Sequence, residues 1–401
     1  MIAHILRMIW NRKRANLLLL VEMLLSALVL FLVLSQLLFA LQKYLTPLGF
    51  NRENVLALNV RPSADDATLN TRTMQEIQRE LQTWPEIQAI CAMTPIPYVN
   101  STWRTSYEQA PAGFRSNIHL VHTGIQDALG AELSEGSWPS EADLGGARTP
   151  LVVTRQFVTE YWPDEADDLL TGRTSAIGRD IGDDEKRYRI VGVLPWLRPK
   201  GELMQPVPLM LRFETSDGSS ENFIDGMLIR VGPGQMTGAM EERITQLIQR
   251  LAPGWSISLN SLDHLRRSTL REKALPLLIA GLVVAFLLLM VGLGLIGVLW
   301  QSVTRRRAEL GLRRALGATR EQIGLQLLGE IAILSLLAMA GAWLIILQLP
   351  FLGFTKDIGW GIFMAALGLS TAMVLLLALL AGAYPGWLST RIAPSEALHH
   401  E

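Results

Sequence analysis

The chain has 401 residues, of which 49% are hydrophobic, and its formal net charge at pH 7 is −1. A mean hydropathy of +0.26 is high for a soluble protein, and the excess is concentrated in a few segments. The near-neutral balance arises because basic edges offset a mildly acidic middle. No basic patch interleaved with aromatic residues indicates nucleic acid as a partner.

Four long apolar segments dominate the chain. Each holds at least about 20 mostly apolar residues, enough to cross a hydrocarbon core about 30 Å thick. The first is too long for the apolar part of a cleaved signal peptide, and no clear small-residue cleavage site follows it. We therefore predict an α-helical integral membrane protein with four transmembrane helices, at residues 15–41, 274–300, 323–349 and 362–388.

The charges beside these segments predict their orientation. Residues 1–14 form a basic amphipathic helix without acidic residues, which the positive-inside rule places in the cytoplasm. Four crossings return the tail at residues 389–401 to the same side. They leave a short outer loop at residues 350–361. Both termini are therefore expected in the cytoplasm.

The residues between the first two spans, 42–273, are predicted to form a large extracytoplasmic α/β domain. Strand, helix and strand patterns occur at both of its ends, which predicts a split ferredoxin-like subdomain from residues 43–95 and 205–261. The intervening residues 96–204 are rich in turn signals and predict a mainly β subdomain. Charged helical residues 262–273 then form a stalk that runs into the second span.

The cytoplasmic loop at residues 301–322 contains six arginines and two glutamates. Its apolar residues recur along one helical stripe, and Glu309 precedes Arg313 by one helical turn, a favourable pair. Gly317 is suited to end this helix, and Thr319 opens a capping box for the next one. Two interpretations stay open: a docking helix for a cytoplasmic partner, or an ordinary positive-inside loop with a solvated charged face.

The motifs that would indicate nucleotide or metal binding do not lie in the structural context that such binding requires. Gly292-x-Gly294-x-x-Gly297 has a dinucleotide-binding spacing, but it lies inside a span without a preceding strand, so close helix packing is the better interpretation. The sequence contains no G-x-x-x-x-G-K-[ST] motif, so it does not hydrolyse nucleotide through a P-loop. His119 and His122 fall on opposite faces of a predicted strand, which argues against a metal site. No catalytic residues are identified, and we expect no enzyme activity from this chain alone.

Three isolated residues need an interpretation. Glu22 and Glu330 lie roughly two turns inside the cytoplasmic ends of spans one and three. A charge at mid-bilayer costs about 2.5–3.5 kcal/mol, and less near an end, so a structural role at a helix junction is favoured over a proton relay. The single cysteine, Cys91, excludes an internal disulfide and is expected to be a buried small hydrophobe.

Several segments together resemble a known family. Arg307–Thr319 (RAELGLRRALGAT) is similar to the R-x-E-I-G-[IL]-R-[RK]-A-[LM]-G-A segment of the MacB/FtsX-like permeases of ABC transporters, the mechanotransmission type. Similar matches are found in the closing segments Ala381–Pro385 and Arg391–Leu398, and in two strands of the outer domain. MacB carries a fused nucleotide-binding domain ahead of its first span. Here about 14 residues precede that span, so the ATPase is expected to be a separate chain.

The resemblance implies a function and partners. It implies a permease subunit of the bacterial inner membrane that transmits the motion of an ATPase to its outer domain, for export or release of a peptide, drug-like or lipid-linked substrate. The expected partners are an ABC-type ATPase, which binds ATP and Mg, and a second permease copy or paralogue. A periplasmic adaptor and an outer-membrane duct are further expected partners. The chain itself is expected to hold no cofactor or metal.

The resemblance and the charge pattern together give the candidate residues for ATPase docking. They are Arg305, Arg306, Arg307, Glu309, Gly311, Arg313, Arg314, Leu316, Gly317 and Thr319. The alternative function is a membrane receptor or regulator, whose outer domain senses a ligand or controls a cell-envelope partner. Both functions share the same topology, so they differ only in whether an ATPase binds the inner loop.

Overall fold

The computed structural model describes residues 13–63, 66–107, 109–146, 148–182, 187–215, 223–305 and 319–389. These residues form two compact units. One unit consists of residues 1–42 and 274–401, and the other of Lys43–Lys273. The second unit is called the inserted domain below.

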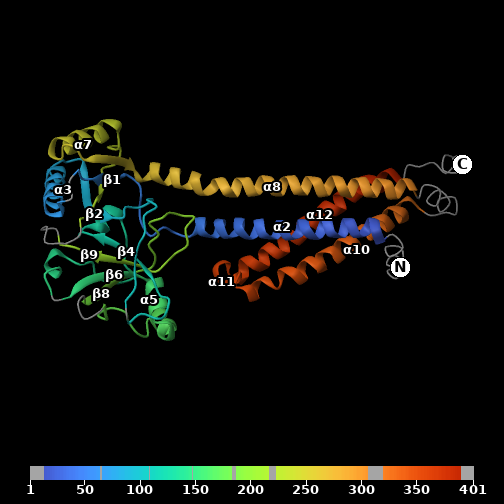
Figure 1. Cartoon of the computed structure of the whole chain (residues 1–401), viewed down its shortest axis with the longest axis horizontal. Coiled ribbons are helices and arrows are strands. Elements are labelled where there is room, and N and C mark those ends of the chain that lie inside the picture. The colour runs from blue at the N-terminus through green and yellow to red at the C-terminus, as the bar shows by residue number, and fades with distance from the viewer. Residues whose placement is uncertain are drawn as a thin grey trace. The chain divides into compact units, whose positions relative to one another are not determined.

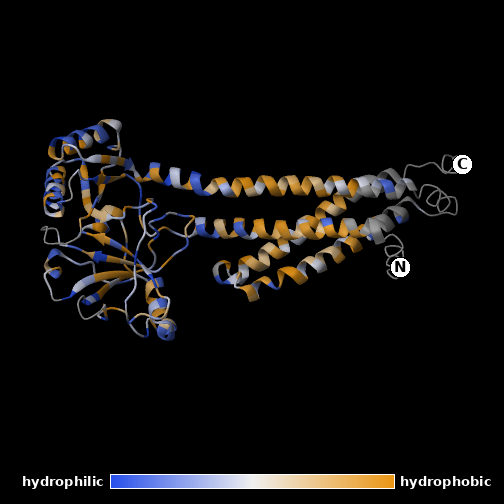
Figure 2. Ribbon diagram, in the orientation of Figure 1, coloured by the Kyte–Doolittle hydropathy of each residue, from blue (hydrophilic) through white to orange (hydrophobic). Residues whose placement is uncertain are grey.

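The first unit is a set of long apolar helices (Figures 1 and 2). The described residues contain four helices that are long and apolar enough to cross a membrane, which confirms the predicted four-helix membrane fold. The helices are α2 (Lys13–Leu45), α8 (Leu262–Arg305), α10 (Arg320–Ile346) and α12 (Trp360–Ser389), with the short η3 (Leu349–Leu352) and α11 (Thr355–Ile358) between the last two.

The helices of this unit pack through apolar and small residues. Phe31 and Phe363 are fully buried, with their rings 5.3 Å apart in an edge-to-face contact between α2 and α12. A Cβ atom on Gly341 of α10 would lie 2.9 Å from a methyl group of Leu24 on α2. Small residues therefore allow close approach of the helices, as is usual in membrane bundles.

Among its described residues, the inserted domain contains one continuous sheet of eleven strands, in the order β11-β1-β10-β2-β4-β9-β6-β8-β5, with β3 beside β4 and β7 beside β8. The strands are β1 (Val55–Arg61), β2 (Ile87–Thr94), β3 (Trp103–Thr105), β4 (Ser116–Val121), β5 (Glu135–Gly136), β6 (Thr149–Thr154), β7 (Asp180–Gly182), β8 (Arg187–Leu194), β9 (Leu209–Phe213), β10 (Gly226–Val231) and β11 (Ser256–Ser261). The helices are α3 (Ala67–Gln82), α4 (Ile125–Leu129), α5 (Arg155–Tyr161), α6 (Ala166–Leu170) and α7 (Gly238–Leu251), with η1 (Glu141–Asp143) and η2 (Pro163–Glu165).

The first four strands of the sheet order form the predicted split ferredoxin-like arrangement. Strands β11, β1, β10 and β2 are neighbours and all pair antiparallel, as two interleaved β-α-β units require. Side chains alternate along β1, so Leu56 and Leu58 pack against α3 and α7 while Ala57 faces the other core. Both helices begin at side-chain caps, with Asp66 accepting from Leu69 N at 3.0 Å in α3.

The remaining strands continue this sheet rather than form a separate one. Met93 and Thr94 of β2 pair with Val121 and Leu120 of β4, which joins the two halves. Strands β4 and β9 are parallel, as are β6 and β8. Strand β9 pairs with β4 and β6, so it lies in this half and not with the α/β part that residues 205–261 were expected to form. This half also contains the helices α4, α5 and α6, in addition to the strands that the sequence predicted.

Candidate coupling site in the inserted domain

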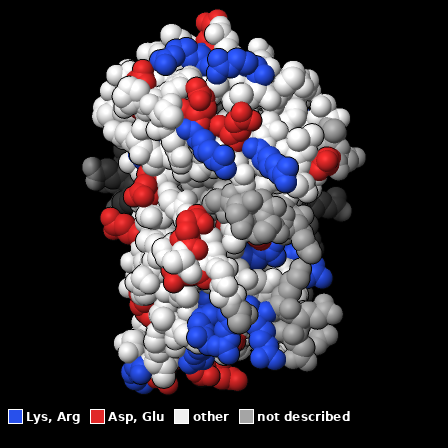
Figure 3. All heavy atoms as spheres, turned by 90° about the vertical axis from the view of Figure 1, so that its left-hand side faces the viewer, with Lys and Arg blue, Asp and Glu red and all other residues white. Residues whose placement is uncertain are grey.

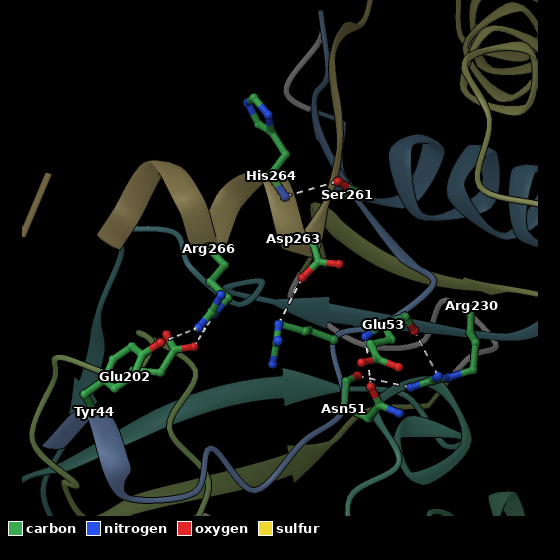
Figure 4. Close-up of polar contacts among 10 residues, drawn as sticks. Tyr44, Asn51, Glu53, Glu202, Arg230, Ser261, Asp263, His264 and Arg266 are labelled. Carbon is green, nitrogen blue, oxygen red and sulfur yellow. Dashed lines mark hydrogen bonds and ion pairs between the residues drawn. The ribbon is translucent and has the colours of Figure 1, made fainter. Parts of the chain in front are cut away.

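The start of the inserted domain and its last helical segment are joined by polar side chains, several of which Figure 4 shows as sticks. The residues after α2 and the first turns of α8 both contact the loop that follows β8. We call the polar residues at this meeting point the stalk junction. It comprises Tyr44, Arg52, Arg198, Glu202, Asp263 and Arg266.

Arg198 lies at the centre of the stalk junction and is 2% exposed. One guanidinium nitrogen donates to the carbonyl oxygens of Lys43 and Thr46, at 2.9 and 2.7 Å. The other donates to the carbonyls of Glu202 and Met204, the second at 2.6 Å. The planar, multi-donor guanidinium suits this arrangement, because a lysine has too compact a head to reach four carbonyls. Arg198 therefore ties the end of α2 to the loop.

Glu202 ties the same loop to the stalk. It is 5% exposed, and one carboxylate oxygen accepts a hydrogen bond from Arg266 Nε on α8. A second Arg266 nitrogen lies 3.4 Å from the hydroxyl of Tyr44 at the end of α2. Figure 4 shows Tyr44, Glu202 and Arg266 directed toward one another. The hydrogen bond to Glu202 raises the pKa of Arg266, so the guanidinium stays ionised at neutral pH.

A second ion pair joins the same two segments. Arg52 Nε donates to Asp263 in the first turn of α8 at 2.9 Å. Leu262, the first residue of α8, is fully buried in the core of the inserted domain. The hydroxyl of Ser261 accepts a hydrogen bond from His264 N at 3.1 Å and so stabilises the start of the helix. The beginning of α8 is therefore anchored by apolar burial as well as by charge.

The loop itself is held by close backbone contact. Gly49 has φ +82°, and a Cβ atom there would lie 2.1 Å from the carbonyl oxygen of Trp196. Arg198 N also donates to Leu48 O at 2.9 Å. Only glycine combines this backbone conformation with so close an approach. The segment after α2 is thus fixed against the loop that carries Arg198.

Buried polar atoms remain around Arg198. The hydroxyl of Tyr98, Nε of Arg198 and one oxygen of Glu202 are buried and have no hydrogen-bond partner among the described residues. Burial raises the pKa of Tyr98 and lowers that of Arg198, although the Glu202 carboxylate opposes the second effect. Ionised groups in so dry a place interact strongly, because a low local dielectric strengthens each contact. The stalk junction therefore forms a strong polar connection between the segments that it joins.

Neighbouring contacts support the segment around Arg52. The guanidinium of Arg230, on β10, donates to the carbonyls of Asn51 and Glu53 at 3.1 and 3.2 Å. It also donates to Asp127 O at 3.0 Å. Figure 4 shows Arg230, Asn51 and Glu53 together beside the stalk junction. The chain between α2 and β1 is therefore bonded to β10 as well as to the loop that carries Arg198.

Most of the predicted docking residues lie outside the described residues, which end at Arg305 and resume at Thr319. Arg305 is the last residue of α8. The predicted capping box is confirmed: Thr319 Oγ1 accepts from Gln322 N at 3.2 Å, and Gln322 Oε1 accepts from Thr319 N at 3.0 Å. The role of these residues in ATPase docking stays a prediction. The closing segment Arg391–Leu398 also lies outside the described residues.

The intramembrane glutamates have different surroundings. Glu22 on α2 lies against Gly294 of α8, where a Cβ atom would be 2.7 Å from one carboxylate oxygen. A Cβ on Gly292 would be 3.5 Å from a methyl of Leu377, whereas Gly297 has no atom within 4 Å. Two of the three glycines of that motif therefore face another helix, in line with a packing interpretation. Glu330 lies partly buried on α10.

His119, His122 and Cys91 are buried in the inserted domain. His119 is buried with Nδ1 2.8 Å from Pro95 O, and burial lowers its pKa to about 4, so it stays neutral at physiological pH. Burial raises the pKa of Cys91 to about 12, which leaves it a protonated, unreactive thiol. Among the described residues no group of three or more His, Cys, Asp or Glu side chains is arranged to hold a metal ion.

Sequence reasoning did not find the stalk junction. Arg198 and Glu202 stand in a segment, Trp196–Glu202 (WLRPKGE), whose proline and glycine signal only a surface turn. Their partners lie about 150 residues earlier and about 60 residues later in the chain, which no local pattern reveals. The one available signal was the charged stalk pattern that contains Asp263 and Arg266.

Comparisons with known proteins agree with this architecture. Residues 281–394 match the family described as FtsX-like permease C-terminal. The chain is 28% identical over 246 residues to a macrolide export ATP-binding/permease protein MacB of Bdellovibrio bacteriovorus, covering 58% of this chain and 37% of that protein. It is 25% identical over 318 residues to the MacB of Escherichia coli K12, covering 76% of this chain and 46% of that protein. The chain thus spans less than half the length of these curated relatives.

Two solved structures are similar to the inserted domain at low identity. The periplasmic region of MacB from Actinobacillus actinomycetemcomitans aligns with a TM-score of 0.36 and 13% identity, over 57% of this chain and 97% of that one. The extracellular domain of the noncanonic ABC-type transporter YknZ, from Gram-positive bacteria, aligns with a TM-score of 0.34 and 13% identity, over 51% and 100%. With four membrane-length helices, an inserted α/β domain and an FtsX-like permease C-terminal region, the architecture of this multi-pass membrane protein fits that of the MacB/FtsX-like permeases.

Proposed function

We propose that this chain is the permease subunit of an ABC transporter and passes the motion of a separate ATPase to its inserted domain. The observation that carries the proposal is that helix α8 is continuous and that its first turn is anchored in the inserted domain. Helix α8 runs without a break from Leu262, buried in the inserted domain, to Arg305 beside the predicted docking loop. The proposed role of the chain is mechanical, with ATP and Mg bound by the partner.

The length and continuity of α8, which contains Pro276, suit this role. Its 44 residues span about 66 Å at the rise of an α-helix. A push or rotation applied at one end of a helix reaches the other end, provided that both ends are held. The stalk junction holds the far end, and it ties the start of α8 to the end of α2 through Glu202 and Arg198. The two connections to the inserted domain would then move as one.

A second copy of the chain, or a paralogue, completes the proposed assembly. Only 6% of the residues in the most apolar stretch of α8 are buried within the chain, against 33–39% in the corresponding stretches of the other three spans. Its exposed apolar residues recur at helical spacing at Leu278, Leu282, Phe286, Leu289 and Leu293. Such a surface is suited to contact lipid and a second permease within the membrane.

The proposed setting is the bacterial inner membrane, with both termini in the cytoplasm and the inserted domain on the outer side. The proposed export substrate is peptide, drug-like or lipid-linked and is handled by the inserted domain; the relatives named for macrolide export support the drug-like class. A periplasmic adaptor and an outer-membrane duct would extend the path. The alternative is a receptor or regulator with the same topology, in which no ATPase engages the inner loop.

Co-purification of the tagged full chain from native membranes separates these two functions. We expect recovery of an ATPase that carries a P-loop, and loss of at least about tenfold of it with Glu309→Lys plus Arg313→Glu, because a reversed charge pair opposes its former partners. The matched control is Glu272→Lys plus Arg271→Glu, which makes the same exchange on the stalk. It should leave recovery unchanged. Recovery of only a signalling or cell-wall partner, or full ATPase retention after the loop reversal, would count against the transporter.

A further inference from the structure

The loop that follows β8 runs along the stalk beyond the stalk junction. Glu202 accepts a hydrogen bond from Arg266 of α8. About one helical turn further on, a Cβ atom on Gly201 would lie 4.0 Å from the methyl group of Thr269. The loop therefore follows α8 in the direction of Lys273, the last residue of the inserted domain.

Helical spacing places Lys273 on the side of α8 that faces this loop. Leu262, Arg266, Thr269 and Lys273 stand at i, i+4, i+7 and i+11, which is one stripe of an α-helix. The first three members of the stripe contact other parts of the inserted domain. Lys273 is the next member and is half-buried, and its charge acts on Lys200 of the loop. The fold thus brings two lysines together that are far apart in the sequence.

A third cation lies close to these two lysines. The ammonium group of Lys200 donates to the hydroxyl of Thr102, and Arg104 follows on the same face of β3, because alternate residues of a strand share a face. Partial burial lowers the pKa of Lys200, and the charges of Arg104 and Lys273 lower it further. Charges in salt solution interact mainly within about 10 Å, so these three groups are near neighbours. We call Arg104, Lys200 and Lys273 the cation cluster.

Other basic residues of the inserted domain lie beside carboxylates. Arg243 of α7 pairs with Glu86 at 3.1 Å, and Arg250 lies 3.9 Å from Glu80 of α3. Figure 3 shows the face of the inserted domain at the left of Figure 1, where several basic side chains adjoin acidic ones. Within the described part of the chain, no ion pair joins a member of the cation cluster to a carboxylate. Like charges held together repel one another, and a bound anion would remove that repulsion.

The place of the cation cluster along the chain indicates which anion it meets. Lys273 directly precedes the predicted second span, which continues with the exposed Leu275. Tyr44 at the end of α2 and Trp196 in the loop that carries Lys200 are exposed, and both residue types are enriched between hydrocarbon and headgroups. Lipid phosphates lie at this level, where basic residues beside a span attract anionic lipids. We propose that the cation cluster binds the phosphate group of an anionic phospholipid in the leaflet nearer to the inserted domain.

This inference depends on the membrane placement of α8 and not on the proposed transport function, so it is tested without an ATPase. The unfolding temperature of the full chain in a neutral detergent is measured with short-chain phosphatidylglycerol, short-chain phosphatidylcholine or inorganic phosphate. We expect phosphatidylglycerol to raise the temperature saturably, because a ligand that binds the native state stabilises it. Phosphatidylcholine and inorganic phosphate should give smaller shifts, since the first carries a cationic headgroup and the second has no acyl chains. Lys200→Gln plus Lys273→Gln should weaken the affinity for phosphatidylglycerol by about tenfold or more, because two attractive charges are lost.

Matched variants separate lipid binding from folding and from general charge. Lys200→Arg plus Lys273→Arg keeps both charges and should retain most of the affinity. Arg72→Gln plus Arg79→Gln removes two exposed charges from α3 and should leave the affinity unchanged. If the double glutamine variant does not fold, Lys273→Gln alone carries the test, since it keeps the hydrogen bond from Lys200 to Thr102. Equal shifts with inorganic phosphate and phosphatidylglycerol, or an unchanged affinity for phosphatidylglycerol in the glutamine variants, would overturn the inference.

Discussion

Arg198→Ala is expected to destabilise the inserted domain by about 3–5 kcal/mol, as removal of one member of a buried charged network generally does. The change deletes four hydrogen bonds to backbone carbonyls and leaves the Glu202 carboxylate buried beside one fewer positive charge. Buried acceptors without a donor keep their desolvation cost. The measurement is urea unfolding of the full chain, followed by protease susceptibility of the inserted domain.

Two variants sharpen this test. Arg173→Ala removes an exposed arginine and its pair with Asp168, and it should change stability by less than about 0.5 kcal/mol. Arg198→Lys keeps the charge but reaches fewer of the carbonyls, so only part of the loss should be recovered. An Arg198→Ala domain as stable as the native one would mean that the stalk junction does not hold the end of α2.

Gly49→Ala should lower the free energy of unfolding of the inserted domain by more than about 3 kcal/mol, for a different physical reason. At φ +82° a Cβ atom is strained, and here it would also lie 2.1 Å from the carbonyl oxygen of Trp196. A backbone atom cannot rotate away as a side chain can, so the loop that carries Arg198 must shift. The same unfolding measurement applies, and a loss of the four Arg198 contacts should accompany the change.

Gly113→Ala is the matched control for that substitution. Gly113 has nearly the same backbone angle, φ +83°, but no atom lies within 4 Å of its Cβ position. It should show only the conformational cost, about 1–2 kcal/mol. Equal costs at the two positions would show that the contact with Trp196 is not a constraint.

Much of the membrane unit was predictable because its signals are local. Twenty or more apolar residues in a row have few alternatives to a span, so α2, α8, α10 and α12 follow from composition. The capping box at Thr319 was equally local, since both hydrogen bonds close within three residues. The split ferredoxin-like part was also predicted, because each β-α-β unit carries its own periodicity.

The rest depends on contacts between distant parts of the chain. The pairing of β2 with β4 makes one sheet of the two predicted subdomains, and it involves only two residue pairs. The loop at Arg198 has a sequence typical of a surface turn, yet Arg198 is buried because its partners arrive from the end of α2. The hydrophobic sequence of β9 would suit a strand in either half of the domain, so its position is determined by its hydrogen-bonding partners.

The central claim is that nucleotide-driven motion reaches the inserted domain through α8 and the stalk junction. Hydrogen–deuterium exchange of the chain bound to its ATPase, with and without trapped ATP, tests it most directly. The account predicts that residues 43–52, 197–204 and 262–273 change their exchange together when ATP binds, while α3 stays constant. Unchanged exchange in all three segments, in a complex that hydrolyses ATP, would contradict it.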